Sequence, residues 1–193
     1  TCLDEKQLIT DLQKGSQSAF RHLVDSFQNK VFNTVLSIVQ NAEEAEDVSQ
    51  EVFIEVFESV GKFKGEAKLS TWIYRIATTK ALEQHRRKKA SKRFAFLTSL
   101  FGENDEIVHH PADFEHPGVV FENKERAKIL FKHINQLPDN QKVAFTLYNV
   151  EGLSYQEISE VMQLSLSSVE SLLFRAKTNL RKTLKEYYVN QSI

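Results

Sequence analysis

The sequence predicts an all-α protein built from two small helical domains joined by a flexible linker. Apolar residues recur at helical spacing through most of the 193-residue chain, and no alternating β-branched run typical of strands is present. The six glycines and three prolines fall at the junctions between helical stretches. We therefore expect domains at 1–93 and 124–193, with residues 94–123 as the linker.

The first domain contains three helical patterns. Apolar residues from Phe20 to Ile38 form one stripe, and those from Val48 to Phe57 form a second. The second helix should begin after the N-cap Asn41, with Glu44 at the reciprocal capping position. A third helix is expected from residue 69 or 70 to Arg87. Such stripes usually form the core of a domain, so we expect these helices to pack on one another.

The second domain begins near Lys124 and closes with two helices around a tight turn. Pro138 marks the start of a preceding helix, because proline is tolerated in a first helical turn. Ser154 and Glu157 form a capping box that should begin the first helix of the pair, and Ser167 and Glu170 repeat the device for the second. With a basic C-terminal half on its second helix, the pair is a DNA-reading arrangement. A plain helical hairpin with solvated charges is the alternative interpretation.

Charge is strongly segregated along the chain, although the formal net charge is only −1. Residues 43–58 hold seven acids and no base, whereas residues 80–93 hold seven bases and one acid. A third block, from Arg175 to Lys185, contains bases and no acid. This pattern indicates a protein that binds phosphates at two places and presents an acidic helix to another partner.

Other function classes are less consistent with the sequence. No apolar run approaches the roughly 20 residues that span a bilayer, and no leader precedes Asp4, so we expect a cytoplasmic protein. The lone Cys2 predicts neither a disulfide nor a metal cluster. No catalytic motif is present, so we expect no enzyme and no cofactor. His109, His110 and His116 lie in the acidic linker, where we do not expect them to bind a metal.

Three segments in order resemble an extracytoplasmic-function, or group IV, sigma factor of bacterial RNA polymerase. NAEEAEDVSQEVFIEVF resembles the helix that docks on the polymerase clamp. FKGEAKLSTWIYRIATTKALEQHRRKK resembles the part that opens and reads the minus-10 element. LPDNQKVAFTLYNVEGLSYQEISEVMQLSLSSVESLLFRAKTNLRK resembles the fourth region, whose recognition helix reads the minus-35 element. The resemblance implies that core RNA polymerase and promoter DNA are the partners, and that an anti-sigma factor holds the protein inactive.

The resemblance also implies roles for individual residues. Positions that match the clamp-binding set are Asp47, Gln50 and Glu51. Positions that match the minus-10 set are Lys62, Phe63, Lys64, Lys68, Trp72, Thr79, Lys80, Glu83, Gln84, Arg86, Arg87 and Lys88. Positions that match the minus-35 set are Ser167, Ser168, Ser171, Phe174, Arg175, Lys177 and Arg181. Trp72 is equally consistent with a base-melting aromatic residue and with a core residue.

Some residues depart from the family pattern. Thr79 replaces a common asparagine and Glu83 a common aspartate, which leaves the base preference of the minus-10 pocket open. Glu170 and Leu172 replace residues that are usually basic. Glu170 also fits two roles, as the capping partner of Ser167, which we favour, or as an acceptor for a cytosine amino group. Gln163 replaces a common glycine in the turn, where a positive φ would cause strain.

Two other classes of function remain as alternatives. A stand-alone helix-turn-helix regulator would bind duplex DNA without polymerase, but it leaves the acidic helix and the basic minus-10 segment without a role. A protein-interaction adaptor leaves both basic blocks without a role. Copurification with polymerase distinguishes the sigma factor from both.

Overall fold

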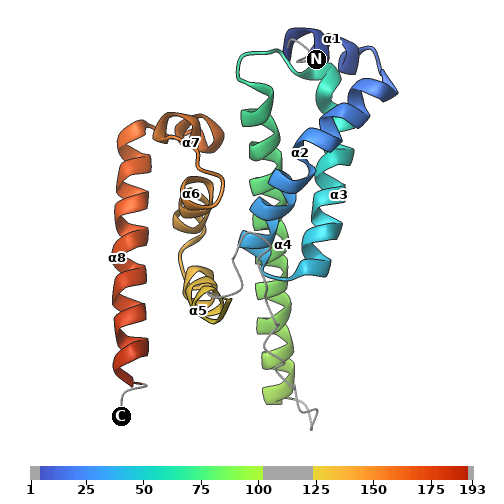
Figure 1. Ribbon diagram of the computed structural model, residues 1–193. Coiled ribbons are helices and arrows are strands. Elements are labelled where there is room, and N and C mark those ends of the chain that lie inside the picture. The colour runs from blue at the N-terminus through green and yellow to red at the C-terminus, as the bar shows by residue number, and fades with distance from the viewer. Residues whose placement is uncertain (1–4, 102–123, 191–193) are drawn as a thin grey trace.

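The structure is a computed structural model that describes residues 5–101 and 124–190, and every regular element in these ranges is helical (Figure 1). The first half contains α1 (Glu5–Gln13), α2 (Gln17–Val39), α3 (Ala42–Ser59), the short 3-10 helix η1 (Val60–Lys62) and α4 (Leu69–Phe101). The second half contains α5 (Lys124–Asn135), α6 (Asp139–Asn149), α7 (Tyr155–Met162) and α8 (Leu166–Asn190). The prediction of an all-α fold is confirmed.

Local signals in the sequence account for most helix starts. The Asn41 side chain accepts a 2.8 Å hydrogen bond from the backbone N–H of Glu44, which confirms the predicted cap of α3. The Glu44 carboxylate does not complete a capping box, because it is bonded to Lys88 of α4 instead. Pro138 lies directly before α6, as expected for a residue that has no backbone N–H to donate.

Two helices differ from the prediction. The expected end of α4 at Arg87 is wrong, since the helix continues to Phe101 and so takes in the first residues assigned to the linker. Residues 88–101 contain neither glycine nor proline, and arginine, lysine and alanine all favour the helical state. The short helix α1 was not expected from its apolar pattern.

The core of the first half lies between α2, α3 and α4. Leu23, Val35, Val52 and Ile73 are fully buried there. Phe57 is the exception in its predicted stripe, because its side chain is 53% exposed and meets Phe20 edge-on, with ring centroids 5.1 Å apart. The core assignment of Phe57 is therefore wrong, and this ring lies on the outer side of α3.

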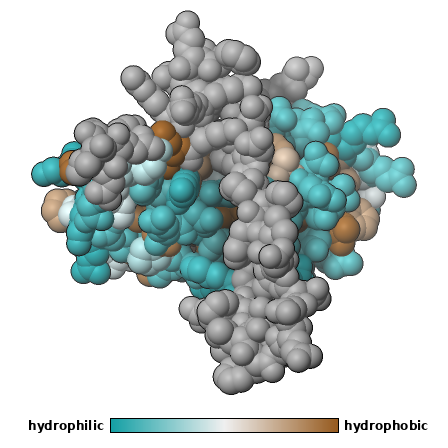
Figure 2. All heavy atoms as spheres, turned by 90° about the horizontal axis from the view of Figure 1, so that it is seen from below, coloured by the Kyte–Doolittle hydropathy of each residue, from teal (hydrophilic) through white to brown (hydrophobic). Residues whose placement is uncertain are grey.

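The core of the second half joins α6, α7 and α8 through Leu147, Ile158 and Leu173, which are also fully buried. In Figure 1, α5, α6 and α7 lie between the long helices α4 and α8. The two halves are in contact: the Gln40 side chain, at the end of α2, donates a 2.7 Å hydrogen bond to the backbone oxygen of Phe131 in α5. On the face shown in Figure 2, hydrophilic side chains cover most of the described surface, and hydrophobic ones form only small separate spots.

Candidate protein and nucleic-acid interfaces

The predicted clamp-binding residues lie together on the outer face of α3. Asp47, Gln50 and Glu51 are all exposed, and their spacing of three and four residues places them on one side of the helix. Ile54 continues this face one turn further and is 58% exposed. Together with the exposed Phe57, it gives the acidic face an apolar end that the sequence analysis missed. The helical period places Ile54 on the outer face, but an isolated isoleucine in a sequence is ordinarily read as core.

The loop before α4 brings Phe63 and Trp72 together. Their ring centroids are 4.9 Å apart with the planes tilted by 35°, and both side chains are half-buried. Two residues of α1 hold this loop in place. The Gln13 side chain donates to the backbone oxygen of Phe63 at 2.9 Å, and the Glu5 carboxylate accepts a 2.7 Å bond from the first backbone N–H of α4. The loop therefore presents a stacked aromatic pair from a fixed backbone.

The remaining minus-10 residues extend along α4 and do not form a single pocket. Trp72 and Lys88 are separated by about 24 Å at the helical rise of 1.5 Å per residue. Thr79, Glu83 and Arg87 are exposed along this length. The exposed Lys62 and Lys64 lie at the loop end, beside the aromatic pair. The predicted set thus forms a long basic strip, called here the α4 strip, with the aromatic pair at one end.

Acidic residues pair with several cations of the α4 strip. Lys80 lies 3.7 Å from the Glu55 carboxylate, and Lys88 is bonded to Glu44, so α3 neutralises two of these charges. Gln84 accepts a hydrogen bond from the Arg87 guanidinium. These cations belong to the basic block that we expect to bind phosphates, and in this arrangement they are partly engaged within the protein.

The paired helices α7 and α8 form a helix-turn-helix. The predicted capping box of α7 is confirmed: Ser154 accepts from the Glu157 backbone N–H, and the Glu157 carboxylate accepts from the Ser154 backbone N–H at 3.0 Å. These hydrogen bonds, first that from the backbone, hold the pKa of Glu157 below its usual range. Gln163 occupies the turn with φ 55°, the left-handed conformation that the sequence analysis considered.

The predicted capping box of α8 is wrong. The helix begins at Leu166, and its cap is Ser165, whose hydroxyl accepts from the Ser168 backbone N–H at 3.2 Å. The hydroxyls of Ser167 and Ser168 lie 3.1 and 2.8 Å from the same Ser165 oxygen. Glu170 is therefore not a capping residue, because it lies beyond the first helical turn.

One face of α8 is exposed from Ser171 to Arg181. The Phe174 ring is 72% exposed, and Ser171, Arg175 and Arg181 are exposed as well. Lys177 lies to the side, with its ammonium 5.1 Å from the centre of the Tyr148 ring. Val169, Leu173, Ala176 and Leu180 are buried on the opposite face. The predicted minus-35 residues after the serines thus lie largely on the free face of the second helix, as a recognition helix requires.

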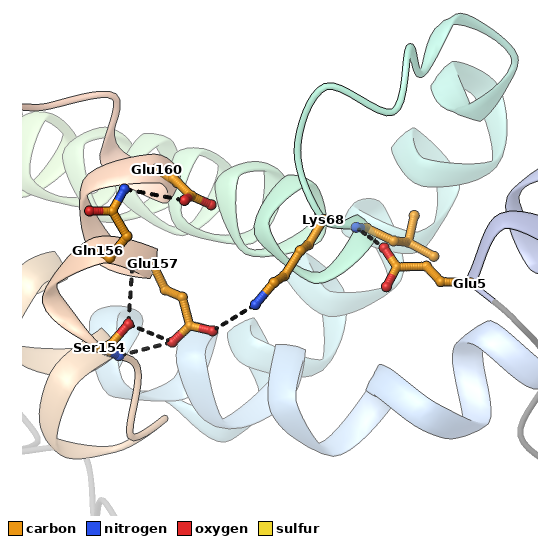
Figure 3. A network of polar contacts seen from close by, with 7 residues as sticks. Glu5, Lys68, Ser154, Gln156, Glu157 and Glu160 are labelled. Carbon is orange, nitrogen blue, oxygen red and sulfur yellow. Dashed lines mark hydrogen bonds and ion pairs between the residues drawn. The ribbon is translucent and has the colours of Figure 1, made fainter.

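Three polar contacts join α4, and Lys68 directly before it, to α7 and to the loop that precedes α7. Lys68 lies 3.4 Å from the Glu157 carboxylate, and Figure 3 shows that this carboxylate is the one held by Ser154. The Arg75 guanidinium donates a 2.8 Å bond to the backbone oxygen of Glu160. The Tyr74 hydroxyl donates to the Glu151 carboxylate at 2.8 Å, and burial raises the pKa of both groups.

A fourth contact, between α4 and α6, is almost entirely buried. The Lys142 ammonium, which is 0% exposed, lies 3.0 Å from Nε2 of His85 and 3.1 Å from Oδ1 of Asn135. An ammonium only donates, so His85 accepts as a neutral imidazole. Burial, with the nearby charges of Lys142, Lys89 and Lys88, lowers the pKa of His85 to about 4, and Asp139 opposes them. Burial lowers the pKa of Lys142 to about 8.

Asp139 also joins this contact to the α4 strip. Its carboxylate accepts a 2.8 Å charged hydrogen bond from Nε of Arg86. Burial alone would raise the pKa of Asp139, but the bond and charge of Arg86 lower it. The packing of the two halves therefore engages Lys68 and Arg86, two of the predicted minus-10 cations, with carboxylates of the second half.

Comparison with known families accounts for both halves. The family model for Sigma-70 region 2 matches residues 23–91, and that for Sigma-70, region 4 matches residues 129–180. The RNA polymerase sigma-H factor of Pseudomonas aeruginosa is 34% identical over 181 residues, which cover 94% of each chain. The ECF RNA polymerase sigma-E factor of Escherichia coli K12 is 33% identical over 179 residues, or 91% of each chain.

The chain belongs to the extracytoplasmic-function sigma factors. As an alternative sigma factor, it directs transcription initiation. Region 2 lies in the first half, and the helix-turn-helix lies in region 4.

Two solved structures share the fold of this sigma factor. CnrH in complex with the cytosolic domain of CnrY has a TM-score of 0.68 at 19% identity, over 94% of this chain and 97% of that one. The sigma factor RpoE of Bartonella quintana, in complex with the anti-sigma factor NepR, has a TM-score of 0.61 at 19% identity, over 86% of this chain and 96% of that one. Both likenesses extend over both regions.

Two further sequence predictions concern metal binding and membrane spans. The histidines His109, His110 and His116 lie outside the described residues. Within residues 5–101 and 124–190, no helix combines the length and the apolar character needed to cross a membrane.

Proposed function

We propose that this sigma factor joins core RNA polymerase through the outer face of α3. The acids Asp47 and Glu51, with Gln50 between them, offer charged and polar contacts on one side of a helix. The exposed Ile54 and Phe57 add apolar area at one end of the same face. A surface of this kind fits a basic partner with an apolar rim, because buried apolar side chains add affinity while charges set orientation.

The α4 strip would then open and read the minus-10 element. A base that leaves the stack must be held against an aromatic or apolar surface, and the Phe63–Trp72 pair offers one beside Lys62 and Lys64. Arg86, Arg87 and the neighbouring lysines would hold backbone phosphates, which provides affinity but no sequence information. Thr79 and Glu83 remain candidates for contacts with the extruded base.

The free face of α8 would read the minus-35 element in the major groove. Ser171, Phe174 and Arg175 lie near its N-terminal end, where a recognition helix usually contacts base edges. Arg181 lies further along, where the helix leaves the groove and meets phosphates. The distribution of charge best supports the whole proposal. Region 2 carries an acidic helix face, and each region carries a separate basic face.

The packing of region 4 on region 2 would keep the free protein from binding promoter DNA well. The Glu157 carboxylate pairs with Lys68 and the Asp139 carboxylate with Arg86, in place of DNA phosphates. We propose that polymerase binding separates the two regions, so that each can reach its own promoter element. An anti-sigma factor, as in the RpoE and NepR complex, would hold this sigma factor inactive until it is needed. We place its action in the cytoplasm, without an enzymatic activity or a cofactor.

Paired substitutions test the residue assignments. Gln50→Ala with Glu51→Ala should weaken the complex with core polymerase at least about tenfold and leave the fold intact, because both side chains are exposed. Asp25→Ala is a control, because Asp25 is an exposed acid on α2, outside the proposed face of α3. Arg175→Ala should spare the polymerase complex and reduce promoter binding. If the control weakens polymerase binding as much as the double variant, the proposed face is wrong.

A stand-alone regulator predicts the opposite pattern. It would bind duplex DNA tightly without polymerase, and the substitutions at Gln50 and Glu51 would have no effect on its activity. Band shifts with and without core polymerase distinguish the two proposals.

A further inference from the structure

Glu170 has no structural task that explains its presence on the recognition helix. The cap of α8 is formed by Ser165, so the carboxylate is not needed to begin the helix. Glu170 is exposed, and within residues 5–101 and 124–190 it makes no hydrogen bond or ion pair. An acid at this place would ordinarily weaken DNA binding, because it faces the negative phosphates of the duplex.

The surroundings of Glu170 are those of a base-reading side chain. Glu170, Ser171, Phe174 and Arg175 line one shallow, open depression on the outer face of α8. All four lie within the first three turns of the helix and are exposed, whereas Val169, Leu173 and Ala176 are buried on its inner face. Arg175 supplies a positive charge on the same face, which offsets the carboxylate as the helix approaches the phosphates.

The chemistry of the major groove favours one base for a carboxylate. A carboxylate only accepts hydrogen bonds, so it needs a donor on the base edge. Guanine presents two acceptors and thymine one acceptor with a methyl group, and both would repel it. Adenine presents a donor beside the acceptor N7, an arrangement that suits an amide better. Cytosine presents its N4 amino group as a donor and no acceptor in the groove.

We propose that Glu170 is a specificity-determining residue, which selects cytosine at one position of the minus-35 element by accepting from its N4 amino group. This inference rests on the proposed function, because it requires α8 to enter the major groove at minus-35. It also assigns a role to one of the positions at which this chain departs from the usual basic residues of its family.

A promoter library tests the proposal with the complete protein. Holoenzyme is assembled from core RNA polymerase and the full chain, and transcripts are selected from promoters in which the minus-35 segment is random. The wild-type chain should enrich cytosine at one position by about tenfold, the order expected for one good base contact. Glu170→Gln should move the preference at that position toward adenine, since an amide pairs with N6 and N7 of adenine. Glu186→Gln, an exposed acid near the other end of α8, should leave the preference unchanged.

A single-atom change in the DNA separates base reading from an indirect effect. Replacing the selected cytosine by 2-pyrimidinone removes only the amino group. This should reduce wild-type initiation by about tenfold and leave Glu170→Ala holoenzyme unaffected. Thermal unfolding should be the same for wild type and Glu170→Gln, because the side chain does not cap the helix.

The outcomes distinguish this inference from the proposed function. Initiation by both chains with identical preferences at every minus-35 position would overturn the role of Glu170 and leave the sigma function intact. Unchanged wild-type initiation on DNA that lacks the cytosine amino group would likewise overturn the role of Glu170. Failure of every holoenzyme to initiate from the library would overturn the proposed function, and the role of Glu170 with it.

Discussion

Mild acid should loosen the packing of region 4 on region 2, because it protonates a histidine that the packed arrangement keeps neutral. Burial and the Lys142 ammonium lower the pKa of His85 to about 4 in that arrangement. An imidazole exposed by separation of the regions would titrate near 6.5. The packed state therefore binds fewer protons, so its stability is fully present above pH 6.5 and is lost as the pH falls toward 4.

The pKa difference sets the size of the effect. Each pH unit in this window costs about 1.4 kcal/mol, so at pH 5.5 the equilibrium should shift toward separated regions by about tenfold. Lys142 acts in the same direction. Its pKa in the packed state is about 8, which is low for lysine, so the packed state releases this proton more readily and packing strengthens as the pH rises above 8. Glu151 acts in the opposite direction, because burial raises its pKa and its protonation favours packing. The lowered pKa of Asp139 matters only at more acidic pH, near the ordinary range of aspartate.

A distance measurement between the regions tests this prediction. Spin labels on cysteines introduced at the exposed positions Ser18 and Lys182, in a Cys2→Ser background, report the separation of α2 and α8. The wild-type distance distribution should broaden toward longer distances between pH 7.5 and pH 5.5. His85→Gln keeps an acceptor for Lys142 but does not titrate, so it should show a much smaller change. An equal response in both chains, or no response in the wild type, would refute the role assigned to His85.

Three further predictions concern α7 and α8. Ser165→Ala should lower the free energy of unfolding by about 1 kcal/mol and Ser167→Ala by less than about 0.5 kcal/mol, as measured by thermal unfolding, and equal losses would contradict the assigned cap. Gln163→Gly should be more stable than Gln163→Ala by about 1 kcal/mol, because only glycine adopts a φ near 55° without strain; denaturant unfolding of both variants decides this. Arg181→Ala should lower the slope of promoter affinity against salt concentration by about one unit, and an unchanged slope would show that Arg181 does not contact a phosphate.

Local sequence patterns predicted most helices. The error at the start of α8 arose because the capping pattern fitted more than one serine. The Ser154 box was predictable because a single serine stands at the right spacing from an acid. Before α8, three serines follow one another closely, and the Ser167–Glu170 spacing matched the capping pattern although the helix begins one residue after Ser165. The long α4 was cut short because bases are typical of a last helical turn, although nothing in this run of bases breaks a helix.

The contacts between the two regions had no signal in the sequence. His85 and Lys142 lie 57 residues apart, and each looks like an ordinary solvated residue in its own helix. A buried lysine depends on partners that come from another element, so periodicity cannot predict it. Phe57 shows the converse, since an aromatic residue in an apolar stripe is usually core, whereas here it lies on the outer side of α3. The residues of the proposed site were assigned by resemblance to the family's motifs, and the engagement of Lys68 and Arg86 by region 4 carboxylates had no signal there.

The most direct test of the central claim mixes the purified chain with bacterial core RNA polymerase, resolves the mixture by gel filtration, and maps transcript starts on genomic promoter fragments. We predict coelution with polymerase and new, discrete start sites that require both proteins. Absence of coelution, together with tight binding of duplex DNA by the chain alone, would contradict the account and favour a stand-alone regulator.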